Sequence, residues 1–345
     1  MVPIAPDTLL QQRYRILNLL GEGKLGRIYL AIDCSRADAY CAIEEIVPFS
    51  QFSGAVAKAK ESFKQEALLL ARLQHLQLPR YWIAFEEENR LFLVRDYIAG
   101  TTYRQLLDDR RDLGTAFSEA EVRQFLLEVL PAIGYLHNKG VIHRDLSPEH
   151  IICRESDSLP VPIDLGVVKE FANQLQASPI SRGAVGQPGY APIEQLYSGE
   201  VHPNTDLYAL AVIAIVLLTG KEPSALFAGD LMNWDWRQWT QIDDNFANVL
   251  GRMLSTNPTD RYQSAVEVSQ ALQSFSFTTS PAEPDELNPN RPSTIPTVAI
   301  GGKNSPEATN HLQAAITNLN AKSVWEKPQV FIPLGVLISL LAGVG

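Results

Sequence analysis

Apolar and polar residues alternate between residues 12 and 100 in the manner of β-strands. The alternating runs are 15–20, 27–32, 41–46 and 91–94. A period of two places one face of each strand against a core. One helical run, 57–73, interrupts the strands. We therefore expect this part of the chain to form a small sheet with one helix.

The pattern becomes helical from Ser118 onward. Ser118 and Glu121 have the spacing of a capping box, and apolar residues follow at intervals of three and four: Val122, Phe125, Leu126, Val129, Leu130, Ile133 and Leu136. The stretch 206–219 is apolar on nearly every side, which is typical of a helix inside a core. The sequence thus predicts an α+β chain, with a strand-rich part before a larger helical part.

The C-terminal region has a different composition. Prolines and small polar residues dominate 281–306 and cannot bury enough apolar surface to order the chain, so we interpret 276–327 as a linker. Residues 330–345 carry no charge and follow Lys322, Trp325 and Lys327. A membrane span needs about 20 apolar residues, so 328–345 is expected to be an incomplete transmembrane segment with the domain on its cytoplasmic side. The alternative is an apolar tail docked on the domain.

Charge and cysteine content narrow the function classes. The net charge of −10 argues against nucleic-acid binding, because an acidic surface repels phosphates. The three cysteines have no CxxC spacing, so neither a disulfide framework nor a zinc site is expected.

A glycine-rich motif lies between the first two strand-like runs. Gly21, Gly23 and Gly26 have the G-x-G-x-x-G spacing, which permits close approach of the backbone to phosphates. The dinucleotide-binding version of this motif opens a helix, whereas this context favours a hairpin that folds over a nucleotide. A glycine-rich turn without a ligand is the alternative.

A second motif is far more specific. Residues 141–152 read VIHRDLSPEHII and are followed by Asp164, Leu165 and Gly166, which resembles the catalytic loop and metal-binding triplet of the protein-kinase family. The resemblance covers 12–275 and points to the bacterial, Hanks-type Ser/Thr branch, in which many members carry a single membrane helix. It implies a two-lobed fold, with an N-lobe over 12–98, a C-lobe over 99–275, and ATP with Mg or Mn in the cleft.

The resemblance also implies roles for individual residues. Asp145 would be the catalytic base, Asp164 a metal ligand, and Glu66 the helix glutamate. Arg144 would receive a phosphate on Ser178 or Ser181. Three further residues would support the fold: Asp206 and the ion pair of Glu194 with Arg261.

The third predicted strand departs from the family pattern. Glu44 occupies the position of the lysine that holds the ATP phosphates, and a register slip of one residue offers only Glu45. If Glu44 faces Glu66 at about 5 Å, the repulsion is roughly 3 kcal/mol in an effective dielectric of about 20.

Two catalytic-loop positions also differ. Ser147 replaces the lysine that steadies the transferring phosphate, and His150 replaces the asparagine that holds the second magnesium. Imidazole is a poor ligand for a hard cation, although manganese tolerates it better.

Arg95 occupies the gatekeeper position at the back of the nucleotide pocket. Our hypothesis is a compensated exchange in which Arg95 bridges Glu44, with Glu66 as a further partner, and so holds the helix inward without a lysine. A second route to the lost cation is Lys24 or Arg27 reaching the phosphates from the glycine-rich loop. The alternative for these two residues is a solvated surface charge.

These departures predict a membrane-anchored signalling protein of the Ser/Thr kinase family that is a pseudokinase or a severely slowed kinase. It is expected to act through protein partners, with ATP binding retained. One alternative is an active, divergent Ser/Thr kinase with Asp145 as base. The other is a scaffold that binds no nucleotide.

Overall fold

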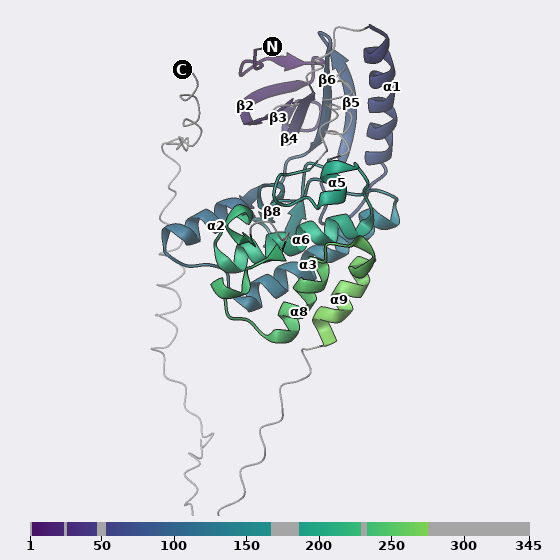
Figure 1. Ribbon diagram of the computed structural model, residues 1–345. Coiled ribbons are helices and arrows are strands. Elements are labelled where there is room, and N and C mark those ends of the chain that lie inside the picture. Colours follow the sequence, from purple (N-terminus) through teal and green to yellow (C-terminus); the bar gives the residue numbers. More distant parts are fainter. Residues whose placement is uncertain (1, 24–25, 47–52, 167–185, 229–232, 275–345) are drawn as a thin grey trace, which may run out of the picture. The chain divides into compact units, whose positions relative to one another are not determined.

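The computed structural model describes residues 2–23, 26–46, 53–166, 186–228 and 233–274 (Figure 1). The chain divides into two compact units, Met1–Ser280 and Pro281–Gly345, and the described residues all belong to the first. The predicted linker and the predicted transmembrane segment lie outside them.

An antiparallel sheet and one helix make up the N-terminal lobe. Within the described residues the sheet has six strands in the order β1-β2-β3-β4-β6-β5. The strands are β1 (Leu9–Leu10), β2 (Tyr14–Glu22), β3 (Gly26–Asp33), β4 (Ala39–Ile46), β5 (Tyr81–Glu87) and β6 (Arg90–Asp96), and the helix is α1 (Ser53–Leu70). Helix α1 runs beside β5 (Figure 1).

Helices dominate the C-terminal lobe. They are α2 (Tyr103–Asp112), α3 (Glu119–Asn138), α5 (Ile193–Tyr197), α6 (Pro203–Thr219), α7 (Pro223–Leu226), α8 (Asp244–Met253) and α9 (Ala265–Ser274), with the 3₁₀ helices η1 (Pro148–His150), η3 (Arg237–Trp239) and η4 (Pro258–Asp260). Two small sheets complete the lobe: β7 (Gly100–Thr102), β8 (Ile151–Arg154) and β9 (Pro160–Pro162) in one, and β10 (Phe227–Ala228) with β11 (Asn233–Trp234) in the other.

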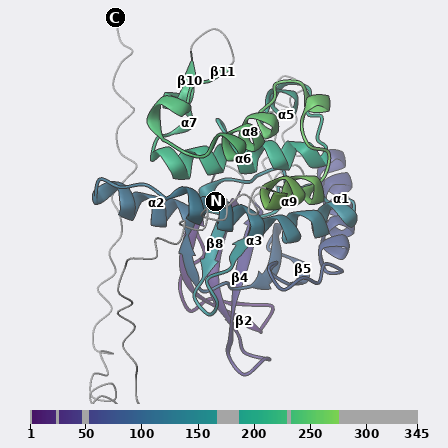
Figure 2. The ribbon, with the colours of Figure 1, turned by 90° about the horizontal axis from the view of Figure 1, so that it is seen from below.

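Local sequence explains the two central helices. Helix α3 begins with the predicted capping box, in which the backbone N–H of Glu121 donates to Ser118 Oγ and the Glu121 carboxylate accepts from the Ser118 backbone. Helix α6 is buried along almost its whole length and contacts α3 and α8 (Figure 2). It ends at Gly220, whose φ of 65° is the left-handed cap that glycine adopts without strain.

The interior forms two apolar clusters. The larger one joins the C-terminal lobe to one face of the N-terminal sheet, which carries Ile46, Leu91 and Leu93 and packs against Phe63 of α1. We call this the inner face. The smaller cluster covers the opposite, outer face and includes Tyr14, Tyr29, Cys41, Ile43 and Phe92.

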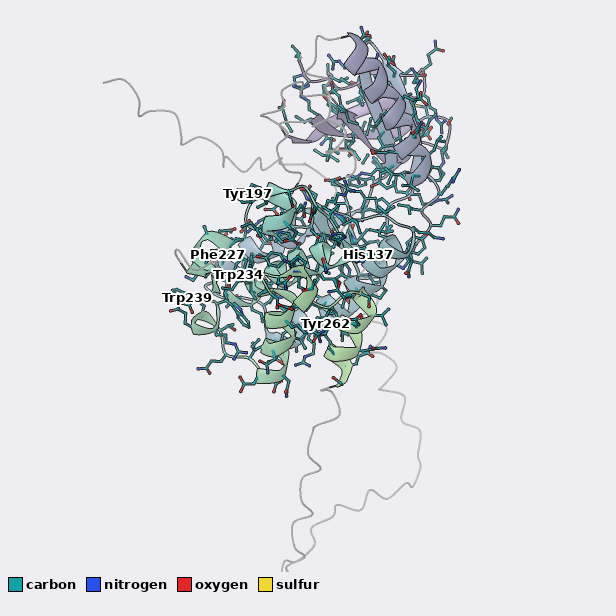
Figure 3. All side chains as sticks on the ribbon, turned by 45° about the vertical axis from the view of Figure 1, so that its right-hand side comes forward. His137, Tyr197, Phe227, Trp234, Trp239 and Tyr262 are labelled. Atoms are coloured by element: carbon teal, nitrogen blue, oxygen red, sulfur yellow. The ribbon has the colours of Figure 1, made fainter. Side chains whose placement is uncertain are left out.

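Aromatic residues pack together where β10 and β11 lie against α6. Trp234 packs edge-on against Phe227, with ring centroids 4.9 Å apart (Figure 3). Its Nε1 donates to Tyr208 Oη at 3.1 Å. These contacts attach the β10–β11 hairpin to α6.

The prediction of a strand-rich part before a helical part is confirmed, although β5 was not expected. The apolar positions of β5 are interrupted by a bulge between Tyr81 and Ile83, so it lacks a regular period of two. No helix in the described part of the chain is long and apolar enough to cross a membrane.

Candidate functional site

Strand β4 directs two adjacent carboxylates to opposite faces of the sheet. Glu44 pairs with Leu93 of β6, which belongs to the inner-face cluster, whereas Glu45 pairs with Phe92 of the outer-face cluster. Because side chains alternate along a strand, Glu44 shares the inner face with Ile46. Glu44 therefore lies on the inner face of the sheet, and Glu45 lies on the outer face.

Glu45 is fully buried on the outer face, where two arginines and one tyrosine hydroxyl neutralise its charge. Tyr29 Oη donates to Glu45 Oε2 at 2.7 Å, Arg90 Nη1 donates to Oε1 at 3.0 Å, and Arg27 Nη1 lies 3.4 Å from Oε2. Burial together with this carboxylate raises the pKa of Tyr29 to about 12. Arg27 also donates to Glu22 at 2.8 Å. Its pairing with Glu45 is a contact of the outer face and not of the cleft.

The glycine-rich hairpin leaves little room beneath its second strand. Gly23 donates its backbone N–H to the Gly26 carbonyl at 2.9 Å. A Cβ at Gly26 would lie 2.0 Å from the Glu45 carbonyl oxygen, whereas a Cβ at Gly21 would meet nothing within 4 Å. Gly26 is thus required by packing against β4. Lys24, the other predicted phosphate contact, lies outside the described residues.

Arg95 is a buried cation at the end of β6, with 3% of its surface exposed. Its Nη2 forms an ion pair with Asp164 Oδ1. Burial alone would lower the pKa of Arg95, but the charges of Asp164, Tyr81 and Glu44 raise it. Arg95 thus has an ion-pair partner, Asp164, that the predicted bridge to Glu44 and Glu66 did not include, and Glu44 adds to the negative charge around it. Sequence reasoning had reserved Asp164 for a metal and did not consider it as the partner.

His150 lies between Asp145 and Asp164. Its Nδ1 is 2.9 Å from Asp145 Oδ2 and 2.6 Å from the Asp145 carbonyl oxygen, and its Nε2 is 4.0 Å from Asp164 Oδ2. Two acceptors at Nδ1 indicate that this nitrogen carries the hydrogen. Ser147 Oγ lies 3.4 Å from the same nitrogen. Ser147 and His150, the two altered loop positions, thus contact each other, and His150 also contacts Asp145, the expected catalytic base.

The backbone around Asp164 is tightly constrained. Asp164 has a φ of 56°, in the left-handed region, and Gly166 donates its backbone N–H to the His143 carbonyl at 2.8 Å. A Cβ at Gly166 would approach that carbonyl oxygen to 2.8 Å, so glycine is needed there. Asp164 is therefore held at a fixed place beside the catalytic loop.

These groups do not suit a magnesium ion. Magnesium prefers oxygen ligands in near-octahedral geometry. In this cleft one oxygen of Asp164 pairs with Arg95, and the position of the second metal ligand holds the imidazole of His150. The described residues contain no group of three or more His, Cys, Asp or Glu side chains that could hold a metal ion.

Glu66 of α1 lies near the positive charge of Arg144. Burial raises the pKa of Glu66 to about 7, and the charge of Arg144 partly opposes that shift. Glu66 Oε2 is buried and has no hydrogen-bond partner in the described part of the chain.

Asp206 fixes the backbone of the catalytic loop. Its Oδ2 accepts from His143 N at 2.8 Å and from His137 Nε2 at 2.8 Å, and its Oδ1 accepts from Arg144 N at 2.9 Å. His137 comes from α3, inside the helical lobe (Figure 3). Arg144 has a φ of 66°, and these bonds hold it in that left-handed conformation.

The predicted ion pair between Glu194 and Arg261 is present. Arg261 Nη1 and Nη2 donate to Glu194 Oε1 and Oε2 at 2.6 and 3.1 Å, and only 1% of the Arg261 side chain is exposed. Next to Glu194, Gln195 Nε2 donates to the Arg144 carbonyl at 2.6 Å and so links α5 to the catalytic loop. Ser178 and Ser181 lie outside the described residues.

Arg104 of α2 makes three side-chain contacts that the sequence did not predict. Its Nε donates to Glu149 at 2.7 Å, its Nη1 to Glu222 at 2.8 Å and its Nη2 to Tyr190 Oη at 2.9 Å. The acceptors come from three separate segments, and no short motif marks such a convergence.

Comparisons with known proteins agree with this architecture. Residues 14–275 match the model of the protein kinase domain. The chain is 35% identical over 273 residues to serine/threonine-protein kinase B of Synechocystis sp., covering 76% of this chain and 47% of that protein. It is 33% identical over 278 residues to serine/threonine-protein kinase PknA of Nostoc sp., covering 77% and 48%. The chain thus spans about half the length of the curated relatives it matches.

One solved structure has a similar fold. PpkA-294 in its apo form is matched with a TM-score of 0.65 and 27% identity, over 79% of this chain and 99% of that one. The matched region contains both lobes and every described cleft residue discussed above. The chain therefore belongs to the Ser/Thr protein kinase family, with bacterial Hanks-type kinases among its relatives.

Proposed function

We propose that this chain is a signalling protein whose kinase domain has lost phosphoryl transfer, or performs it very slowly, and acts by binding protein partners. The observation that carries the proposal is Glu44 on the inner face of β4. In the family, the lysine at this position holds the ATP phosphates and pairs with the helix glutamate. A carboxylate repels the same phosphates, and removing one transition-state donor typically costs about 100-fold to 1000-fold in rate.

The surroundings of Glu44 support the proposal. Arg95, the buried cation nearby, is paired with Asp164, and Arg27 is paired with Glu22 and Glu45. Ser147 and His150 remove two further groups that act on the phosphates and the metal in the family. These losses belong to one site, so their effects on the rate do not simply multiply.

Nucleotide binding and membrane attachment complete the proposal. Protein kinases use ATP with Mg or Mn, and the hairpin with Gly21, Gly23 and Gly26 supports retention of a nucleotide. The uncharged residues 330–345 support attachment to the cell membrane, with the kinase domain on the cytoplasmic side.

A second candidate is an active, divergent Ser/Thr kinase. Asp145 is retained and 2% exposed, and the curated relatives carry the names of Ser/Thr kinases. In this case Asp145 would accept the proton of the substrate hydroxyl. A nucleotide-independent scaffold is the third candidate, and a thermal shift with ATP separates it from the other two.

The deciding experiment is radiolabelled phosphoryl transfer by the full chain. We expect wild type to incorporate label at, or only slightly above, the level of Asp145→Asn, and Glu44→Lys to incorporate more than wild type. Glu44→Gln is the matched control, because it removes the negative charge without adding a cation. Transfer by wild type at about 1–100 per second, abolished in Asp145→Asn, would establish the second candidate instead.

A further inference from the structure

We propose that Arg95 keeps divalent cations away from Asp164, and that removal of this one guanidinium opens a divalent-cation site at Asp164. The proposal deepens the proposed function, on which it rests, by naming the residue that decides the metal chemistry of the cleft. It concerns the binding of Mg²⁺ or Mn²⁺ and is independent of whether phosphate is transferred.

The first argument is the ion pair itself. Arg95 comes from β6 in the N-terminal lobe, Asp164 follows β9 in the C-terminal lobe, and their side chains are 4% and 11% exposed. Charges attract more strongly in such surroundings than at the surface, because less water screens them. A metal at Asp164 would either lie beside a fixed positive charge or displace the guanidinium, which would leave a buried charge without its partner.

The second argument is that Arg95 has limited freedom to move. Its strand neighbours Leu93 and Val94 are each 1% exposed, and Tyr81 lies opposite it in the pairing of β5 with β6. The buried Nε of Arg95 has no acceptor among the described residues, so Asp164 is the group that orients the guanidinium. The pairing of β6 within the sheet therefore directs the Arg95 side chain toward Asp164.

Two other carboxylate oxygens near Arg95 also face a nitrogen atom. His150 Nδ1 lies 2.9 Å from Asp145 Oδ2, and His150 Nε2 lies 4.0 Å from Asp164 Oδ2. Arg95 is nevertheless the decisive group, because its guanidinium is permanently charged and pairs with Asp164 Oδ1, an oxygen that would otherwise be open to a metal. A neutral residue in its place leaves the carboxylate of Asp164 available to a cation.

Strand β6 supplies a matched control. Arg90 also pairs with a buried carboxylate, Glu45, but on the outer face of the sheet. Arg90→Met therefore removes the same charge from the same strand, and Glu45 keeps Arg27 and Tyr29 as partners. It leaves the cleft untouched.

The test is titration of the full chain with Mn²⁺ alone, with free Mn²⁺ measured by electron paramagnetic resonance. We expect Arg95→Met to bind Mn²⁺ at least about tenfold more tightly than wild type, which corresponds to about 1.4 kcal/mol. We expect Arg90→Met to bind as wild type does. Adding Asp164→Asn to Arg95→Met should remove the gain, which assigns the new site to Asp164.

Two results would overturn the proposal. One is a folded Arg95→Met, as judged by circular dichroism, that binds Mn²⁺ no more tightly than wild type does. The other is a gain in affinity that persists when Asp164→Asn is added to Arg95→Met. If Arg95→Met does not fold, Arg95→Gln removes the charge with a hydrogen-bonding side chain and is judged by the same criterion. Phosphate transfer by wild type would contradict the proposed function and leave this metal measurement unchanged, so the two failures are distinguishable.

Discussion

Glu44 and Glu45 are neighbours in β4 and lie on opposite faces of the N-terminal sheet. Glu45 is 0% exposed and is neutralised by Arg27, Arg90 and the hydroxyl of Tyr29. Glu44 instead contributes negative charge around Arg95. A shift of the strand by one residue would exchange these two environments, so the contacts of Glu45 help to hold the register that places Glu44 on the inner face.

Glu45→Gln is expected to destabilise the domain by about 3 kcal/mol, because it leaves two largely buried arginines without their shared carboxylate. Urea unfolding of both proteins measures the difference. Glu88→Gln is the control, since Glu88 is exposed, and it should change the stability by less than about 0.5 kcal/mol. A Glu45→Gln protein as stable as this control would show that the buried pairs contribute nothing.

The glycine-rich hairpin permits a comparison of two similar substitutions. Gly26→Ala would place a methyl group 2.0 Å from the Glu45 carbonyl oxygen, so we expect a loss of about 1–3 kcal/mol from the displaced backbone. Gly21→Ala meets no atom within 4 Å and should be close to neutral. Thermal unfolding of the two variants decides the matter. Equal melting temperatures would mean that the hairpin adapts without cost.

Glu66 gives the domain a pH dependence of stability. Burial raises its pKa from 4.5 to about 7, so between these values the folded state binds more protons than the unfolded state. The stabilisation associated with this proton is complete below pH 4.5 and is lost as the pH rises through 7, by at most about 3 kcal/mol.

The corresponding variant is Glu66→Gln, which cannot ionise. It should flatten the stability profile between pH 4.5 and 7 and be more stable than wild type at pH 8. Denaturant unfolding at several pH values compares the two. Parallel profiles over this range would mean that the Glu66 carboxyl titrates in the folded state as it does in the unfolded chain.

Short-range patterns predicted much of the fold. The spacing of Ser118 and Glu121 identified the start of α3, because a capping box is local in sequence. The alternation of apolar and polar residues over 41–46 predicted β4 and the face of the sheet on which Glu44 lies. The pair of Glu194 with Arg261 is distant in sequence, and it was predicted only because the family resemblance supplied both positions.

The partner of Arg95 could not be predicted in the same way. Glu44, Glu66 and Asp164 were all near the inferred pocket, and sequence order does not say which carboxylate a buried guanidinium reaches. The choice depends on the left-handed backbone at Asp164 and on the pairing of β6, which only three-dimensional geometry supplies. The same reason explains why the three acceptors of Arg104 were missed.

The larger apolar cluster does not stop at the boundary between the lobes. Residues of the sheet such as Ile46, Leu91 and Leu93 belong to the same continuous interior as α3 and α6. Separating the lobes would expose this shared surface to water, so unfolding of one lobe would destabilise the other. The two halves are thus expected to melt in a single cooperative transition, and neither is an autonomous folding unit.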